Sequence, residues 1–305
     1  MRSRWTWRLV ALPGVAWLSV FFLCAFYAVL AVAFGNQDTL SQPVPHWNPL
    51  DWNVGYVIDM LDNVVHGGPF WTVSLRTIEF VGIAVALSLL VGYPVAYFTA
   101  RHAGRWKGAI LLALILPLWI NYLMRMLAWI NLLAPDGIGS RVLHSMGIER
   151  IFLSLGLLEE PGGWLNGQPT TVVLALLYGY IPFFILPLFV ALDRIDRRQI
   201  DAARDLGASA MSAFVRVTLP LSVPGILAGS VLIALPMFGD YYTADLVSAS
   251  TQTNMIGNQI DEFMRQGSEK VTGAALTLLL STFLLFLMFY YLRTTRRAGT
   301  SAQTT

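Results

Sequence analysis

Long apolar runs separated by short charged links dominate the hydrophobic pattern of this chain. Six runs contain no Asp, Glu, Lys or Arg: Leu9–Gln37, Phe80–Ala100, Gly108–Met124, Leu165–Leu192, Val217–Gly239 and Val271–Leu292. A helix needs about 20 apolar residues to cross the ~30 Å hydrocarbon core of a bilayer. Each run approaches or exceeds that length, so the pattern predicts an all-α membrane protein with six transmembrane helices.

The same pattern divides the chain into four parts. Residues 1–35 form an N-terminal transmembrane helix, 36–74 an outer loop, 75–292 a five-helix core that includes a charged elbow at 193–220, and 293–305 a polar tail. The first apolar run exceeds the ~7–15-residue core of a secretory signal peptide. We therefore expect it to stay in place as a membrane anchor.

Prolines interrupt four of the six predicted helices. They are Pro94, Pro117, Pro182, Pro187, Pro224 and Pro236. Proline removes a backbone hydrogen bond and kinks a helix. Such kinks suit a bundle that opens and closes, but static packing explains them equally well.

The basic residues predict the orientation of the helices. Of the 20 Lys and Arg residues, 14 lie in the N-terminus, the second and fourth links and the tail, which all face the same side. Lys and Arg in short loops remain cytoplasmic, so we expect both termini in the cytoplasm. The first outer loop instead carries Asp38, Asp51, Asp59 and Asp62 and no Lys or Arg. Topology thus accounts for the basic face, and no nucleic-acid partner is expected.

Composition excludes several classes of function. The chain is 56% hydrophobic and 12% charged, with a mean hydropathy of +0.60. The one cysteine, Cys24, lies within the first apolar run, and the four histidines are scattered over different loops, so neither a disulfide nor a Cys/His metal site is expected. We find no phosphate loop, no ATP-binding motif and no nucleophile–base pair. We therefore predict that the chain is not an enzyme and that a partner protein supplies the energy for its function.

The elbow at 193–220 is the most distinctive segment. It begins as a helix dense in Asp and Arg, and Gly207 then permits a break with a left-handed cap. Beyond the break, Met211, Phe214, Val215 and Val217 recur at helical spacing. An apolar stripe on a short surface helix suits binding in the groove of a soluble partner.

The elbow resembles the cytoplasmic motif of permease subunits in ATP-binding-cassette importers. That motif reads Glu-Ala-Ala, three residues, Gly, nine residues, Ile, one residue, Leu-Pro. Here Asp201 replaces the Glu and Val217 the Ile, while Ala202, Ala203, Gly207, Leu219 and Pro220 match at the same spacing. The resemblance implies that these seven residues form the coupling motif that sits in a cleft of the ATPase subunit.

Further segments are similar to the spermidine/putrescine branch of that family. They include Leu206–Ser209, Pro224–Ile226, Asp245-Leu246, Ile256–Asn258 and Gly92–Tyr97. The resemblance implies a type I importer permease fold in the bacterial cytoplasmic membrane, which translocates polyamine by alternating access. It also implies a second, different permease subunit, two ATPase subunits and an external polyamine-binding protein. No cofactor is expected on this chain, since ATP and magnesium would be used by the ATPase.

A polyamine route needs carboxylates and aromatic faces, because ammonium groups pair with the former and lie over the latter. Asp240, Tyr241, Tyr242 and Asp245 provide both at the outer end of the fifth predicted helix, about 30 Å above Pro220. If that helix persists, Tyr241 and Asp245 share one face. Two interpretations stay open: an acidic, aromatic mouth, or the solvated end of a helix.

The third predicted helix supplies the other candidates. Trp119 and Tyr122 share one helical face, and Asn121 and Arg125 another. The aromatic pair fits a pore wall or ordinary packing. A bare cation would repel a cationic substrate, so Arg125 is expected to snorkel to the outer interface or to pair with an acid.

Two alternatives remain. The first is an importer of the same architecture for an iron complex, an opine or an anion, against which the acidic outer face argues mildly. The second is an ion-coupled secondary transporter. Such proteins bury ionisable residues near the midplane, whereas the fourth and sixth apolar runs contain none.

Overall fold

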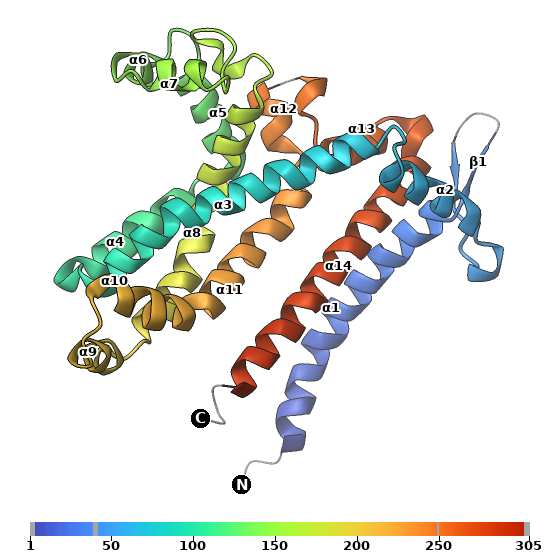
Figure 1. The fold of residues 1–305 in the computed structure, drawn as a ribbon. Coiled ribbons are helices and arrows are strands. Elements are labelled where there is room, and N and C mark those ends of the chain that lie inside the picture. Colours follow the sequence, from blue (N-terminus) through green and yellow to red (C-terminus); the bar gives the residue numbers. More distant parts are fainter. Residues whose placement is uncertain (1–3, 39–41, 249, 302–305) are drawn as a thin grey trace. The chain divides into compact units, whose positions relative to one another are not determined.

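A computed structural model describes residues 4–38, 42–248 and 250–301, and Figure 1 shows that they are mainly helical. Five helices are long and apolar enough to cross a membrane: α1 (Arg4–Ala33), α3 (Trp71–Arg101), α8 (Pro169–Asp193), α11 (Leu219–Phe238) and α14 (Lys270–Ser301). The bent pair described next makes a sixth span when its two halves are counted together. The prediction of an all-α membrane protein is confirmed.

The third predicted helix is not continuous. A 3-10 turn, η2 (Gly104–Trp106), leads into α4 (Lys107–Ile115) and a second 3-10 turn, η3 (Leu116–Trp119). The next helix, α5 (Tyr122–Leu133), leaves at 95° to this first half.

Local chemistry explains the bend. Pro117 lies in η3, and Ile120 is extended, with ψ of 133°. The Asn121 side chain then accepts a hydrogen bond from Leu123 N at 2.9 Å and caps the new helix. Asparagine is among the preferred N-cap residues because its side-chain oxygen satisfies a free backbone N–H.

The chain forms two compact units. The first combines residues 1–72 with 259–283, and the second combines 73–258 with 284–305. The first unit contains α1, the antiparallel strands β1 (Asn36–Gln37) and β2 (Pro43–Val44), η1 (Pro49–Asp51) and α2 (Val54–Val65). In its core, Met60 of α2 packs with Ala275 and Leu276 of α14.

In the second unit, α8 and α11 pack closely because glycines lie between them. A Cβ on Gly225 would lie 2.4 Å from Ala191 Cβ, and one on Gly229 would lie 2.8 Å from the Phe184 carbonyl oxygen. Phe184 is fully buried, as are Leu188 and Leu192. Small residues allow membrane helices to approach closely enough for extensive van der Waals contact.

Short helices cap both ends of this pair. At one end lie α9 (Arg197–Asp205), α10 (Ala210–Ala213) and the π-helix η5 (Phe214–Thr218). At the other lie α6 (Ile138–Ser145) and α7 (Ile148–Ser154), as Figure 1 shows. The remaining elements are η4 (Gly163–Leu165), α12 (Tyr242–Ser248), η6 (Thr251–Thr253), α13 (Ile256–Arg265) and η7 (Gly267–Glu269).

We predict that Gly225→Val destabilises the protein by about 1–3 kcal/mol, the usual cost of overpacking a filled interior. The added side chain would force α8 and α11 apart. Thermal unfolding of the purified chain in detergent measures the effect. The matched control is Gly82→Val on α3, where a Cβ meets nothing within 4 Å. An equal loss in both variants would contradict the packing argument.

Candidate functional site

The elbow begins with α9, a charged helix capped at its start by Asp196. The Asp196 side chain accepts a hydrogen bond from Arg198 N at 3.0 Å. Asp201, Ala202, Arg204 and Asp205 are exposed, and Ala203 is half-buried. This first half of the motif is therefore presented to the surroundings rather than packed in the bundle.

Gly207 ends α9 with a left-handed cap, as the sequence predicted. Its φ is +87°. Gly207 N donates to Arg204 O at 2.9 Å, and Ala208 N donates to Ala203 O at 3.1 Å. This pair of bonds is the Schellman arrangement, which satisfies the last carbonyls of a helix and favours glycine at the left-handed position.

The second half of the elbow turns back into the bundle. Phe214 packs edge-on against Tyr93 and Tyr97 of α3, with ring centroids 5.7 and 5.6 Å away. Val217 and Leu219 are half-buried, and Pro220 is exposed at the start of α11. The predicted apolar stripe is thus divided, because Phe214 faces inward while Met211 and Val215 remain exposed.

An apolar surface remains at the tip of the elbow. Leu206 is 90% exposed and Met211 70% exposed. An open groove lies beside them, lined by Asp201, Arg204, Asp205, Gly207, Ala208 and Ser209. Exposed leucine and methionine side chains beside mixed charges are typical of a surface that binds a protein partner.

The second candidate region centres on Asp240, which is only 6% exposed. Its Oδ2 accepts hydrogen bonds from Tyr122 at 3.0 Å, Tyr180 at 3.0 Å and the Thr243 hydroxyl at 2.7 Å. Its Oδ1 accepts one from Thr243 N at 2.9 Å. The carboxylate therefore joins α5, α8 and the first turn of α12.

This geometry contradicts one of the two open interpretations of Asp240, the solvated end of a helix, because the side chain is buried. Helix α11 ends at Phe238, and α12 begins anew at Tyr242. Since the helix does not persist, the condition under which Tyr241 and Asp245 would share one face is not met. The close approach of Gly257, where a Cβ would lie 2.7 Å from Asp240 O, helps to enclose the turn.

The rest of the predicted mouth is more open. Asp245 is exposed on α12, and Tyr241 and Tyr242 are half-buried. The two tyrosine rings lie 3.8 Å apart, and Asn258 Nδ2 donates to Tyr241 O at 2.5 Å. Asp245 is thus accessible at the surface and the tyrosine pair partly so, whereas Asp240 is buried.

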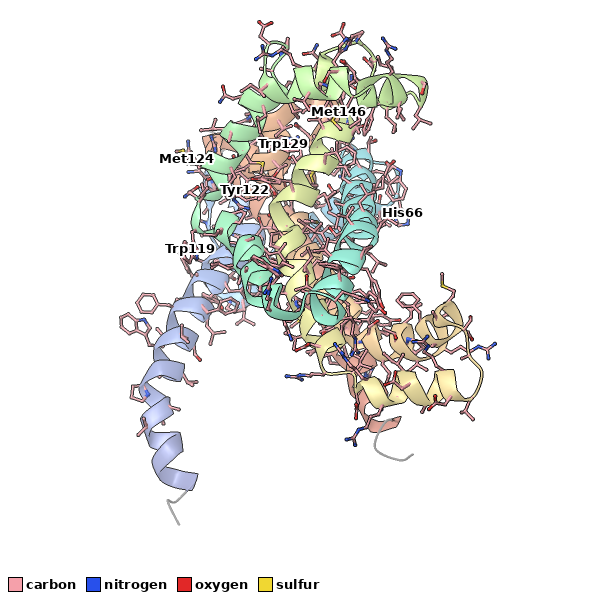
Figure 2. All side chains as sticks on the ribbon, turned by 90° about the vertical axis from the view of Figure 1, so that its left-hand side faces the viewer. His66, Trp119, Tyr122, Met124, Trp129 and Met146 are labelled. Atoms are coloured by element: carbon pink, nitrogen blue, oxygen red, sulfur yellow. The ribbon has the colours of Figure 1, made fainter. Side chains whose placement is uncertain are left out.

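The bend before α5 separates the candidates of the third predicted helix. Trp119 is 74% exposed before the bend, while Tyr122 lies nearer the middle of the bundle, as Figure 2 shows. Their predicted common face is therefore wrong, as is that of Asn121 and Arg125, because Asn121 is an N-cap outside the helix. Gly179 makes room for Tyr122, since a Cβ there would lie 2.8 Å from its ring.

Arg125 does not snorkel. It is 7% exposed, lies 5.2 Å above the Tyr122 ring and donates to Gly179 O at 3.4 Å. Among the described residues no acid pairs with it within 4 Å. Its role is to brace the Tyr122 ring by a cation–π contact.

Tyr180 was missed by sequence reasoning. It lies in a long apolar run, where a single hydroxyl does not stand out against the surrounding pattern. A useful signal was available in the triplet of residues 178–180, in which glycine separates two tyrosines. Among the described residues, no group of three His, Cys, Asp or Glu side chains lies close enough to hold a metal ion.

A family model for "Binding-protein-dependent transport system inner membrane component" matches residues 92–298, about two thirds of the chain. The chain belongs to this family. The match covers the elbow, Asp240 and Asp245, and leaves out α1, α2 and the start of α3. The chain is therefore an inner membrane component of a transport system, and it is the permease subunit.

Curated relatives extend over nearly the whole chain. The spermidine/putrescine transport system permease protein PotB of Haemophilus influenzae is 31% identical over 281 residues, which is 91% of this chain and 90% of that protein. PotB of Escherichia coli K12 is 28% identical over 92% of this chain. The inner membrane ABC transporter permease protein YdcU of the same organism is 32% identical over 65% of the chain.

Solved structures support the type I permease fold of this family member. A chain of a bacterial alginate ABC transporter, in complex with its alginate-bound periplasmic protein, matches with a TM-score of 0.69 at 15% identity and covers 96% of this chain. A chain of the MetNI methionine ABC transporter matches with a TM-score of 0.50 at 17% identity. At such identities these likenesses concern the fold alone.

We predict that Asp240→Asn destabilises the permease by about 1–3 kcal/mol, since an amide nitrogen then faces buried hydroxyl donors. Thermal unfolding in detergent measures the loss. Asp245→Asn is the matched control, because an exposed carboxylate should change stability by less than about 0.5 kcal/mol. If Asp240→Asn unfolds at the same temperature as the control, the carboxylate does not hold this turn in place.

Proposed function

We propose that this permease carries polyamine, of the spermidine or putrescine type, across the bacterial cytoplasmic membrane by alternating access. The observation that carries the proposal is the match to PotB relatives over nine tenths of both chains. The same relatives include proteins from several bacteria, all described as spermidine/putrescine permeases.

The charge of the Asp240 region supports a cationic substrate. Hydroxyl groups donate to the Asp240 carboxyl group, and among the described residues no Lys or Arg forms an ion pair with it. The rings of Tyr122 and Tyr180 lie 5.7 Å apart beside Asp240, and Arg125 already lies 5.2 Å above the Tyr122 ring. The Asp240 carboxyl group and the Tyr180 ring are therefore the groups that a chain of ammonium and methylene groups would contact here.

A route through this region begins at the surface. Asp245 is exposed and receives the substrate first, together with Tyr241 and Tyr242. Asp240 then offers the second carboxylate after a hydroxyl donor moves away. Trp119, Asn121 and Tyr122 line the bend in α4 and α5 that borders the route.

The elbow supports an ATP-driven mechanism. Three of its seven motif residues lie on the exposed helix α9 and Gly207 follows it, while Val217 lies in η5 and Leu219 and Pro220 begin α11. Because the elbow leads into α11, the motion of a partner bound to α9 is transmitted to this membrane-spanning helix. We propose that the partners are two ATPase subunits at this face, a second, different permease subunit and an external polyamine-binding protein.

Two further parts of the proposal concern orientation and cofactors. The distribution of 14 of the 20 basic residues supports an orientation with both termini and the elbow in the cytoplasm. The chain itself holds no cofactor, and the ATPase partners bind and hydrolyse ATP with magnesium.

Reconstitution tests the substrate. The permease pair, the ATPase and the binding protein in liposomes should take up spermidine or putrescine, and Asp245→Asn should lower the apparent affinity about fivefold. One charge pair in a well-hydrated site contributes about 1 kcal/mol, which corresponds to that factor.

Asp136→Asn is the control, because it removes another exposed acid from the outer connection of the same unit. Uptake of an iron complex, an opine or an anion in place of polyamine would contradict the proposed substrate. Uptake driven by an ion gradient without ATP would contradict the proposed ATP-driven mechanism.

A further inference from the structure

A basic groove lies where α3 and α8 end, beside the start of α9. It has a volume of about 660 Å³. Its wall comes from the last turn of α3, the turn η2, the start of α4 and the link from α8 to α9. All of these segments belong to the second compact unit.

The charges of the groove are unequal. Arg101, Lys107, Arg194 and Arg197 line it together with Asp193 and Asp196, so four positive charges face two negative ones and leave +2. Both acids are already engaged. Asp193 pairs with Lys107 at 2.6 Å, and Asp196 caps α9.

The arginines retain free donors. Arg101 Nη2 donates to Ile195 O at 3.0 Å, but its buried Nε has no acceptor in the described part of the chain. Arg197 Nη2 donates only to Arg101 O, at 3.3 Å. Arg194 is exposed, and its side chain makes no hydrogen bond or ion pair with any described residue. Guanidinium groups arranged in this way match the oxygen atoms of a phosphate, which accept paired hydrogen bonds.

We propose that this groove binds the phosphate of an anionic phospholipid. Arg101 and Asp193 are the last residues of two spanning helices, so the groove lies at the depth of the lipid headgroups. Basic pockets between transmembrane helices on the cytoplasmic side recognise anionic headgroups.

The neighbouring surface suits the rest of a lipid. Trp106 is 62% exposed, and Arg105 lies 5.6 Å above its ring. Tryptophan at this position is typical of the membrane interface. Phe98 and Leu112, both more than half exposed, lie farther along α3 and α4 and provide apolar surface for the acyl chains.

A phosphate held here connects α3 to the elbow. Arg101 ends α3, and Arg197 is the first residue of α9. The bound lipid thus fixes the first turn of the helix that bears the coupling motif. The binding claim itself does not depend on the transported solute.

Native mass spectrometry of the full chain tests the site, with phosphatidylglycerol, phosphatidylcholine and inorganic phosphate as probes. We expect the wild type to retain phosphatidylglycerol in preference to phosphatidylcholine. Arg194→Gln with Arg197→Gln should weaken that binding about 30-fold, at roughly 1 kcal/mol for each basic residue near a phosphate.

Arg198→Gln with Arg216→Gln is the control. Both of its arginines are exposed and lie outside the groove, and the change in net charge is the same. It should retain the preference within about twofold, since general attraction falls off within a Debye length. If the double variant unfolds, Arg194→Gln alone should weaken binding about fivefold, because Arg194 has no described partner to lose.

Three results would overturn the proposal. One is an equal loss in the groove and control variants, which would indicate general surface charge. The second is a wild type without preference between the two lipids. The third is inorganic phosphate that binds as tightly as phosphatidylglycerol, which would assign the groove to a free anion instead.

Discussion

The close contact of α8 with α11 is the interaction on which the rest of this permease depends. Gly225 and Gly229 remove the side chains that would hold the two helices apart, and the buried ring of Phe184 fills the space between them. A bilayer offers no hydrophobic gain for such a pair, so its stability comes from dispersion and from the shape of the surfaces.

The two candidate sites lie at opposite ends of that pair of helices. The elbow joins the end of α8 to the start of α11, and Asp240 follows the end of α11, about 30 Å away. Asp240 also ties α11 to α5 and α8 through Tyr122 and Tyr180. Motion of α9 therefore acts on a closely packed pair of helices whose far end lies next to the buried Asp240 side chain.

The sequence predicted the spans and the elbow well, because both follow from local chemistry. Apolar run length defines a membrane helix, and Gly207 is the residue that a left-handed cap requires. The bend at Asn121 was missed, although Pro117 and an asparagine N-cap were visible. The burial of Asp240 had no local signal, since it depends on hydroxyl groups from two helices that lie 60 and 118 residues earlier in the chain. Long-range partners of this kind are set by packing, which a hydrophobic pattern does not encode.

The central claim is that the tip of the elbow receives motion from an ATPase. A Cβ at Gly207 meets nothing within 4 Å in this chain, so the bulk of a side chain there acts on a partner. Gly207→Ala carries the same left-handed backbone cost of about 1 kcal/mol without that bulk. The decisive measurement is ATP hydrolysis and solute uptake by the reconstituted complex with Gly207→Arg and Gly207→Ala. We expect the arginine variant to insert and assemble but to lose uptake, while the alanine variant keeps most of it. Normal uptake with Gly207→Arg would contradict the account.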